Sequence, residues 1–170
     1  MNLRGLVLIS SVLDFQAIRF HDGNDLPYVL YLPSYTAVAW YHKRLPEPLQ
    51  SKPLQEAMAE AEEWANGEYR AALFRGDALP AADRDKVVER LVRYTGLTKE
   101  VVSLANLRIS GGQFVRELLK SDRRVVGTLD GRVKGISLGP RGYTPDPSLF
   151  ITIGPLVVKD IRKVTSLPLD

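Results

Sequence analysis

The sequence feature that most constrains the fold is a short apolar run near the N-terminus, Leu3–Ser10. Its nearly continuous aliphatic residues are typical of a strand buried on both faces of a parallel sheet. Such a strand needs neighbours on both sides, because its buried backbone groups must be paired. The sequence offers few other strand candidates before residue 120. We therefore expect either that this strand pairs with a partner molecule or that the chain is part of a larger protein.

The middle of the chain indicates helices. Pro33 suits the first turn of a helix that runs to about residue 43, and Pro53 suits the first turn of another. We expect the second helix to end at Asn66–Gly67, where the chain can turn left-handed. The clearest amphipathic helix is Ala81–Thr95, with Gly96 as its natural end. The glutamates of the helix after Pro53 are expected to face solvent: Glu56, Glu60 and Glu63.

Shorter elements complete the helical region. Glu68–Phe74 is predicted to be a short helix, stopped by Gly76. Thr98 suits the N-cap of a helix that runs through residue 105. Ser110 with Gln113 fits a capping box for a helix over 113–120.

After residue 120 the pattern changes from helical to extended. Arg124–Leu129 and Arg132–Ile136 flank Asp130–Gly131, a dipeptide that favours a hairpin turn. Pro155 begins a last element, for which the β-branched residues leave both a helix and a strand open.

Composition and charge exclude several classes of function. The chain has 23 basic and 20 acidic residues, and no long run of like charge, so a nucleic-acid partner is not supported. It has no cysteine, which excludes disulfides, thiolate zinc sites and cysteine nucleophiles. Its apolar runs are too short to span a bilayer, so no membrane partner is expected. No metal site and no cofactor are expected either, because ligand spacings and nucleotide-binding glycine loops are missing.

Gly135–Gly139 matches the Gly-x-Ser-x-Gly pattern of hydrolase nucleophiles, with Ser137 at its centre. In that motif a helix must leave the turn, but Pro140 and further prolines follow. The triad order also places the histidine after the serine, whereas His21 and His42 both come before it. We therefore expect Ser137 to be a loop serine, His21 a turn residue and His42 a helix-end residue.

The candidate pocket residues are Asp14, Tyr28, Tyr31, Tyr35 and Trp40. Asp14 comes just after the predicted strand, where open α/β sheets place ligands and catalytic groups. A loop or capping role is the alternative for this aspartate. The aromatic residues at helical spacing fit a packed core, or the lining of an apolar substrate pocket.

Several segments, in order over nearly the whole chain, carry a family resemblance: Leu6–Asp14, Gly23–Tyr28, Leu32–His42 (LPSYTAVAWYH), Arg93–Leu97, Ala105–Ile109, Val126–Arg132 (VGTLDGR) and Tyr143–Ser148. As an ordered set they resemble the bacterial branch of the serine carboxypeptidase family. The resemblance implies an α/β-hydrolase fold in which a helical cap is inserted after a central strand. It also implies removal of C-terminal residues from peptides by a serine, aspartate and histidine triad through an acyl-enzyme.

The family's nucleophile, oxyanion, acid and histidine motifs have no counterpart in this chain, so the resemblance assigns no catalytic residue here. The expected fold class is α/β but mostly helical, with a hydrolase strand and loop over 1–20. This part is followed by a helical cap region over 21–140, which includes a short extended element. A return segment over 141–170 comes last. We expect this middle part of a carboxypeptidase to be inactive alone.

The expected partners follow from the same interpretation. A peptide substrate is expected if the chain is part of a complete enzyme, and self-association is expected through the exposed edges of Leu3–Ser10. The resemblance implies a secreted or periplasmic location. The alternative is a non-catalytic helical module that binds or interacts with other molecules.

Overall fold

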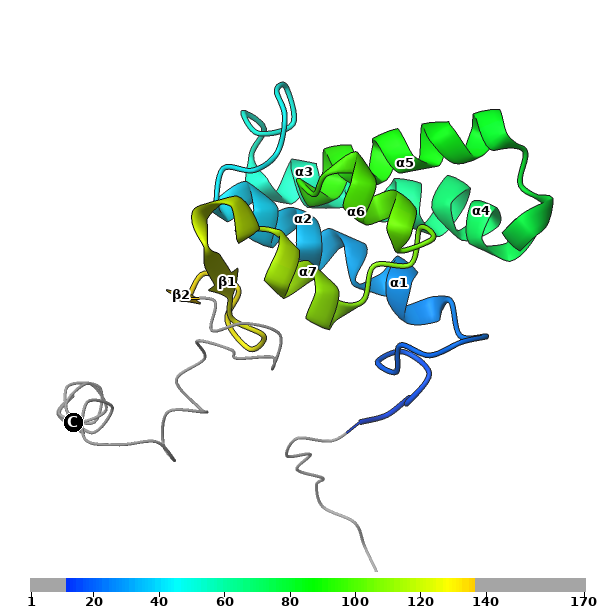
Figure 1. The fold of residues 1–170 in the computed structure, drawn as a ribbon, viewed down its shortest axis with the longest axis horizontal. Helices are drawn as coiled ribbons and strands as arrows, with labels where there is room; N and C mark the ends of the chain where they lie inside the picture. Colours follow the sequence, from blue (N-terminus) through cyan, green and yellow to red (C-terminus); the bar gives the residue numbers. More distant parts are fainter. Residues whose placement is uncertain (1–11, 137–170) are drawn as a thin grey trace, which may run out of the picture.

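The computed structural model describes residues 12–136, and this part is mostly helical with a two-stranded antiparallel sheet at one edge (Figure 1). The predicted strand Leu3–Ser10 and the last element from Pro155 lie outside the described residues. The α-helices are α1 (Leu26–Leu30), α2 (Leu32–Tyr41), α3 (Leu54–Trp64), α4 (Arg70–Arg75), α5 (Ala81–Thr95), α6 (Lys99–Leu104) and α7 (Gly111–Glu117). The other elements are η1 (Ala65–Tyr69), η2 (Gly76–Ala78), η3 (Lys120–Asp122), β1 (Arg124–Val126) and β2 (Lys134–Ile136).

The strongest amphipathic pattern folds as predicted. Helix α5 spans Ala81–Thr95, and Gly96 ends it with φ 67°. A side chain at Gly96 would meet a neighbouring segment, since a Cβ would lie 2.7 Å from the Arg44 carbonyl oxygen. The predicted N-caps are also confirmed: the Thr98 hydroxyl accepts from the Val101 amide, and the Ser110 hydroxyl accepts from the Gln113 amide.

The prediction that a helix ends at Asn66–Gly67 is wrong. Helix α3 continues through the π-helical turn η1 directly into α4, and Gly67 adopts no left-handed conformation. The turn is stabilised by burial of Tyr69, whose ring stacks on Trp64 at 5.3 Å and whose hydroxyl donates to the Leu107 carbonyl at 2.6 Å. These contacts outweigh the cost of about 1 kcal/mol for glycine inside a helix. The helix ends at Gly76, with φ 53°, which confirms the predicted stop at this glycine.

The predicted helix that begins at Pro33 is confirmed as α2, and a separate short helix, α1, precedes it. Helix α1 has Pro27 in its first turn and α2 has Pro33, and Tyr31 joins them in a helical conformation. Because proline fits only the first turn of a helix, the second proline marks where a new helix begins.

The core of the described region lies where α2 packs against α3 and α5. Ala39 of α2 and Ala57 and Ala61 of α3 are completely buried, and small residues there let the two helices approach closely. Larger side chains fill the space around them, among them Leu32, Leu91, Tyr94 and Phe114. Each of these is at most 2% exposed, so this part of the chain encloses its own core.

The predicted hairpin forms with shorter strands than expected. β1 and β2 pair antiparallel, with Arg124 opposite Ile136 and Val126 opposite Lys134. The turn is fixed to the end of α2, because His42 Nε2 donates to the Gly131 carbonyl at 2.7 Å. A Cβ at Gly131 would overlap the Val38 side chain, so a larger residue there would force that side chain to move.

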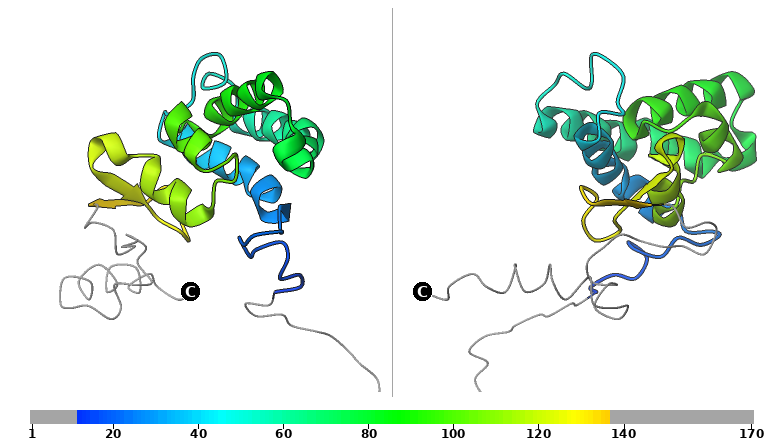
Figure 2. Two further views of the ribbon diagram at one scale, coloured as in Figure 1. Left: turned by 45° about the vertical axis from the view of Figure 1, so that its right-hand side comes forward. Right: turned by 60° about the vertical axis from the view of Figure 1, so that its left-hand side comes forward.

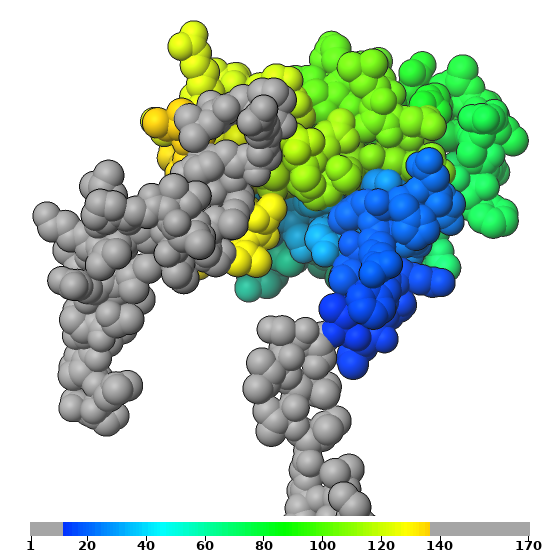
Figure 3. Space-filling model, turned by 60° about the horizontal axis from the view of Figure 1, so that its bottom comes forward, coloured from blue at the N-terminus to red at the C-terminus, as the bar shows by residue number. Residues whose placement is uncertain are grey.

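The two ends of the described region lie on the same side of the helices. In Figure 1, residues 12–25 (blue) lie below α1, and the hairpin (yellow) lies at the lower left, beside α7. Figure 2 shows the same two segments from two further directions. Figure 3 looks onto this side and shows the two segments at separate places across it. None of the described helices is long and apolar enough to cross a membrane.

Candidate functional site

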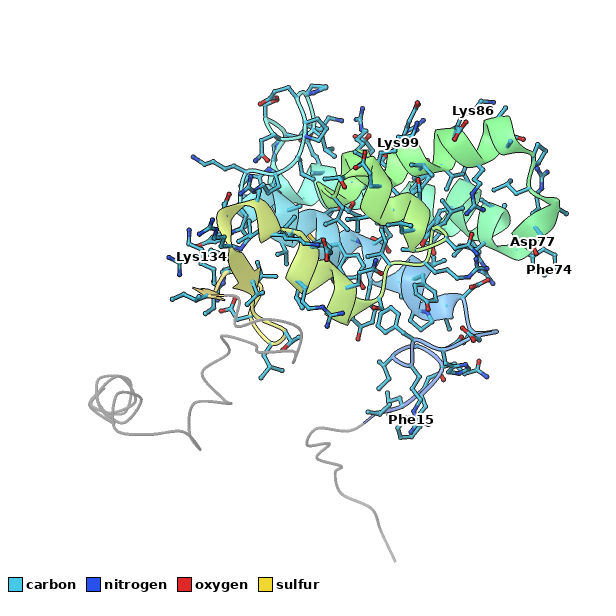
Figure 4. All side chains as sticks on the ribbon, in the orientation of Figure 1. Phe15, Phe74, Asp77, Lys86, Lys99 and Lys134 are labelled. Carbon is cyan, nitrogen blue, oxygen red and sulfur yellow. The ribbon has the colours of Figure 1, made fainter. Side chains whose placement is uncertain are left out.

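The segments at both ends of the described region expose large apolar side chains. We call this set the lower face: Val12, Leu13, Phe15, Ile18, Leu129 and Ile136. Leu13 is 86% exposed and Leu129 is 77% exposed. Figure 4 places Phe15 at the bottom of the molecule, below the helices. Exposed apolar side chains gathered on one side are typical of an interaction surface.

Side-chain hydrogen bonds close a loop in the segment that carries most of the lower face. The Asn24 side-chain amide is largely buried and donates to the carbonyls of Gln16 and Arg19, both at 2.8 Å. Gly23 reverses the chain with φ 82°. The Arg19 guanidinium lies 4.7 Å from the centre of the Phe15 ring. The segment therefore presents its apolar residues as a preformed loop.

The structure places Asp14 in this loop, exposed, where it acts as a turn residue. Its carboxylate accepts a hydrogen bond from the Gln16 amide at 2.8 Å, which is an Asx turn. Trp40 lies elsewhere, half-buried, and its indole nitrogen donates to the Lys52 carbonyl at 3.0 Å. These two candidate pocket residues are therefore held by separate local contacts.

The three tyrosine candidates come together in one row of aromatic rings. The Phe20 ring meets Tyr28 at 5.2 Å and Tyr31 at 5.0 Å, both edge-to-face. Tyr31 meets Tyr35 at 6.1 Å, and Tyr35 stacks on Phe114 at 4.2 Å. Sequence analysis missed Phe20, which no helical spacing connects to the tyrosines. The row runs from the loop of the lower face into the core.

The hydroxyls of Tyr28 and Tyr35 remain donors. Burial raises the pKa of Tyr35 far above its usual range, and its hydroxyl donates to the Ile109 carbonyl at 3.2 Å. Burial also raises the pKa of Tyr28, against the lowering effect of the nearby Arg108 charge. At the half-buried end of the row, Tyr28 and Tyr31 offer apolar rings with polar tips to a bound molecule.

The histidines contact backbone carbonyls. His21 Nδ1 donates to the Asp22 carbonyl at 2.8 Å, and His42 Nε2 donates to Gly131 as described above. Ser137 lies outside the described residues, so its predicted loop role stays a prediction. Within residues 12–136, no group of histidine and acidic side chains could hold a metal ion.

Glu60 is a residue whose role the sequence did not reveal. It was expected to face solvent, but its carboxylate accepts from Lys52 at 2.6 Å, Arg93 at 2.7 Å and Tyr94 at 3.0 Å. Burial alone would raise the pKa of this carboxyl, but the hydrogen bonds from Lys52 and Tyr94 and the charge of Arg93 lower it. Glu60 thus joins α3 to α5 and to the preceding loop. No local pattern could predict partners more than thirty positions away.

Asp25 and Arg108 form a second ionic contact, at the start of α1. Arg108 Nε lies 2.6 Å from one carboxylate oxygen of Asp25, and a terminal guanidinium nitrogen lies 2.9 Å from the other. The same terminal nitrogen donates to the Leu73 carbonyl at 3.2 Å. The pair ties α1 to the end of α4.

Two grooves flank α4. One, of about 720 Å³, lies between α4 and α5 and is lined by charges of both signs, including Arg75, Asp83 and Glu89. The other, of about 480 Å³, lies between α1 and the η1–α4 segment. Its lining residues are Asp25, Leu26, Val29, Asn66, Gly67, Arg70, Ala71 and Phe74.

Comparisons of the chain with protein-family models, with curated proteins and with solved structures found no match.

Proposed function

We propose that this chain supplies the helical cap of a serine-carboxypeptidase-like α/β hydrolase and is inactive alone. In this proposal the catalytic domain lies against the lower face and brings the serine, histidine and carboxylate. The observation that carries the proposal is the position of the two ends. A segment inserted into another domain must leave that domain and return to it on one side, and residues 12–25 and the hairpin meet this requirement.

The apolar side chains of the lower face support the same arrangement. Leu13 and Phe15 on one segment and Leu129 on the other lack a cover in residues 12–136. Burying each on a partner would contribute about 1.5–3 kcal/mol. The preformed loop around Asn24 adds to this, because little conformational entropy is lost on docking.

The chemistry proposed for the complete enzyme is hydrolysis of a C-terminal peptide bond. A serine of the catalytic domain attacks the carbonyl, a histidine transfers the proton to the leaving amine, and backbone amides stabilise the oxyanion. The cap would exclude water and contact the peptide from the side of the lower face. Tyr28 and Tyr31, at the half-buried end of the aromatic row, are the residues of this chain that we propose as pocket lining.

A second candidate is a stand-alone interaction module. The closed core around α2, α3 and α5 favours it, because a body that buries its own apolar residues can fold without a catalytic domain. In this case the lower face would bind a separate partner protein.

The proposed lack of hydrolase activity can be tested on the chain itself. We expect it neither to hydrolyse a blocked dipeptide nor to react with an organophosphonate serine probe. Labelling of any serine would contradict the proposal, and labelling of Ser137 would restore the Gly-x-Ser-x-Gly motif as a nucleophile site.

The proposed docking side can be tested by size-exclusion chromatography over a range of concentrations. Because no described residue covers the lower face, the chain is expected to self-associate, and the double substitution Leu13→Ser and Phe15→Ser is expected to reduce this. Leu104→Ser is the matched control, because Leu104 is 87% exposed but lies on α6. A clean monomer at high concentration, or an equal effect of the control, would contradict the assignment.

A further inference from the structure

We propose that the partner of the lower face presents carboxylates to the corner of the molecule where α2, η3 and the hairpin meet. We call this surface the basic corner, and its residues are all exposed: Lys43, Arg123, Arg124 and Lys134. The inference rests on the proposed function, because the hairpin also carries Leu129 and Ile136 of the lower face. It adds the chemistry of the partner, which is an acidic segment of a protein.

The fold brings together the two places in residues 12–136 where basic residues are adjacent in the sequence. Lys43 and Arg44 follow α2, whereas Arg123 and Arg124 follow η3. The Arg44 guanidinium forms an ion pair with Asp122, directly before the second pair. The hydrogen bond from Arg44 lowers the pKa of Asp122, and the charge of Lys134 adds to this effect, so Lys134 lies near the same carboxylate. Figure 4 shows Lys134 at the left edge of the molecule, beside the hairpin.

The backbone at both basic pairs is unusual for a long side chain. Lys43 and Arg123 have φ angles of 56° and 57°, in the left-handed region that suits glycine and asparagine. Helices α5 and α6 follow this preference, with Gly96 and Asn106 in the left-handed conformation at their ends. The helix dipole favours a positive charge after the ten residues of α2, which accounts for Lys43. The three residues of η3 have little dipole, so Arg123 stands against the local preference without this compensation.

The positive charge of the basic corner is not neutralised by its acidic neighbours. Residues 116–136 contain six basic and three acidic residues. Each acidic residue already has an ion pair: Glu117 with Lys120, Asp122 with Arg44 and Asp130 with Arg132. The side chains of the basic corner have no ion pair within the part of the chain that the structure describes. Residues 54–69 differ, with five glutamates and no basic residue, so the positive charge is local to this corner.

The neighbours of these charges favour a protein partner over a nucleic acid or a lipid surface. Arg124 lies opposite Ile136 in the hairpin register, so a cation and an apolar side chain share one face. Tyr41, at the end of α2, is 52% exposed, and arginine with tyrosine is typical of protein interfaces. The interspersed acidic side chains would repel a continuous row of phosphates. Separate guanidinium groups can each bind one carboxylate at two points, so the proposal commits to an acidic protein segment.

The test uses the full chain, labelled with ¹⁵N, and follows amide chemical shifts by NMR at low salt. The probe is an N-acetylated hexapeptide amide of glutamates and leucines, compared with the same peptide in which glutamines replace the glutamates. We expect saturable shifts at the basic corner and the hairpin, with the acidic peptide binding about tenfold more tightly. Added salt should weaken binding of the acidic peptide only. Equal affinity of the two peptides, or shifts elsewhere, would overturn the proposal.

Two further probes separate the classes of partner. A single-stranded oligothymidine with the same charge as the acidic peptide, and vesicles that contain phosphatidylserine, are titrated under the same conditions. Binding of either probe as tight as that of the acidic peptide, or tighter, would replace the acidic protein by a nucleic acid or a lipid surface and overturn the proposal.

Charge reversal assigns the effect to the basic corner. The double substitution Arg123→Glu and Arg124→Glu should weaken binding of the acidic peptide about tenfold. The matched control is Arg70→Glu with Arg75→Glu, because both arginines are exposed on α4 and the change in net charge is the same. This control should bind within about twofold of the parent chain. An equal loss in the two double variants would overturn the proposal.

A substitution to glycine separates the charge of Arg123 from a structural role. Arg123→Gly relieves the left-handed backbone, so Tm should be equal or higher. The loss of one positive charge should weaken binding of the acidic peptide about threefold. A lower Tm with unchanged binding would give Arg123 a purely structural role and overturn the proposal.

Failure of this inference can be told from failure of the proposed docking side. Leu13→Ser with Phe15→Ser changes the other segment of the lower face, so it should reduce self-association and leave binding of the acidic peptide unchanged. If the peptide does not bind while this variant still reduces self-association, the docking side stands and the acidic partner is wrong.

Discussion

The helical body and the lower face use the same apolar residue types in opposite ways. Phe114 in the body is 2% exposed and stacks on Tyr35, whereas Phe15 on the lower face is 55% exposed. Leu91 of α5 is 1% exposed, whereas Leu13 is 86% exposed. Most apolar side chains of the body are buried, with Phe74 and Leu104 among the exceptions, whereas those of the lower face are not covered by residues 12–136. We therefore expect the body to supply most of the folding stability, and the docking role proposed above falls to the lower face.

The largest expected effect is a difference in the free energy of unfolding between two Phe→Ala variants, one in each region. Phe114→Ala should lower the free energy of unfolding by about 3–5 kcal/mol, because it leaves a cavity beside Tyr35. Phe15→Ala should change it by about 0.5 kcal/mol or less, since the ring is exposed. Urea denaturation followed by circular dichroism measures both. Similar losses for the two variants would show that the lower face is part of the core.

The junction between body and hairpin gives the next effect. Gly131→Ala should destabilise the hairpin by about 1–3 kcal/mol, because the new methyl group overlaps Val38. We expect faster hydrogen exchange in β1 and β2 and unchanged exchange in α5. Loss of protection in both places would mean that the hairpin and the body unfold as one unit.

A smaller effect is expected from a hydrogen bond inside the body. Tyr69→Phe removes the hydroxyl that donates to the Leu107 carbonyl, and should lower the free energy of unfolding by about 1 kcal/mol. Tyr41→Phe is the control, because Tyr41 is 52% exposed. An unchanged denaturation midpoint for Tyr69→Phe would contradict the role given to this hydroxyl in the π-helical turn.

The smallest expected effect depends on pH. The pKa of Glu60 is lowered in the folded chain, so its ionised form stabilises the fold above its ordinary pKa of 4.5. This contribution, about 1 kcal/mol or less, should disappear as the pH falls below 4.5 through the lowered value. Glu60→Gln should therefore be less stable than the parent chain at pH 7 and approach it in acid. A difference that does not depend on pH would contradict the assignment.

Sequence reasoning succeeded where one local signal determines the structure. The α5 helix, the Gly96 end, the Thr98 and Ser110 caps and the hairpin all depend on residues close together in the chain. It failed at Gly67, where burial of Tyr69 against Trp64 outweighs the local preference of glycine. Local propensity cannot reveal such a contact, because the partner carbonyl of the tyrosine hydroxyl lies at Leu107.

The candidate site was predictable only in part. Tyr28 and Tyr31 do lie together near the lower face, but they are joined by Phe20, whose spacing gave no signal. The groove beside α4 was not predicted at all, because it depends on the π-helical turn that carries Asn66 and Gly67 into its wall. Glu60 was placed in solvent because its partners Arg93 and Tyr94 belong to another helix.

The most direct test of the central claim, that the body is a cap for a separate catalytic domain, is to determine the coding sequence on both sides of this chain. The account predicts an in-frame Gly-x-Ser-x-Gly segment upstream, and an aspartate and a histidine of the triad downstream. Flanking sequence without these residues, from a gene whose product is a stable monomer, would contradict it and favour the stand-alone module.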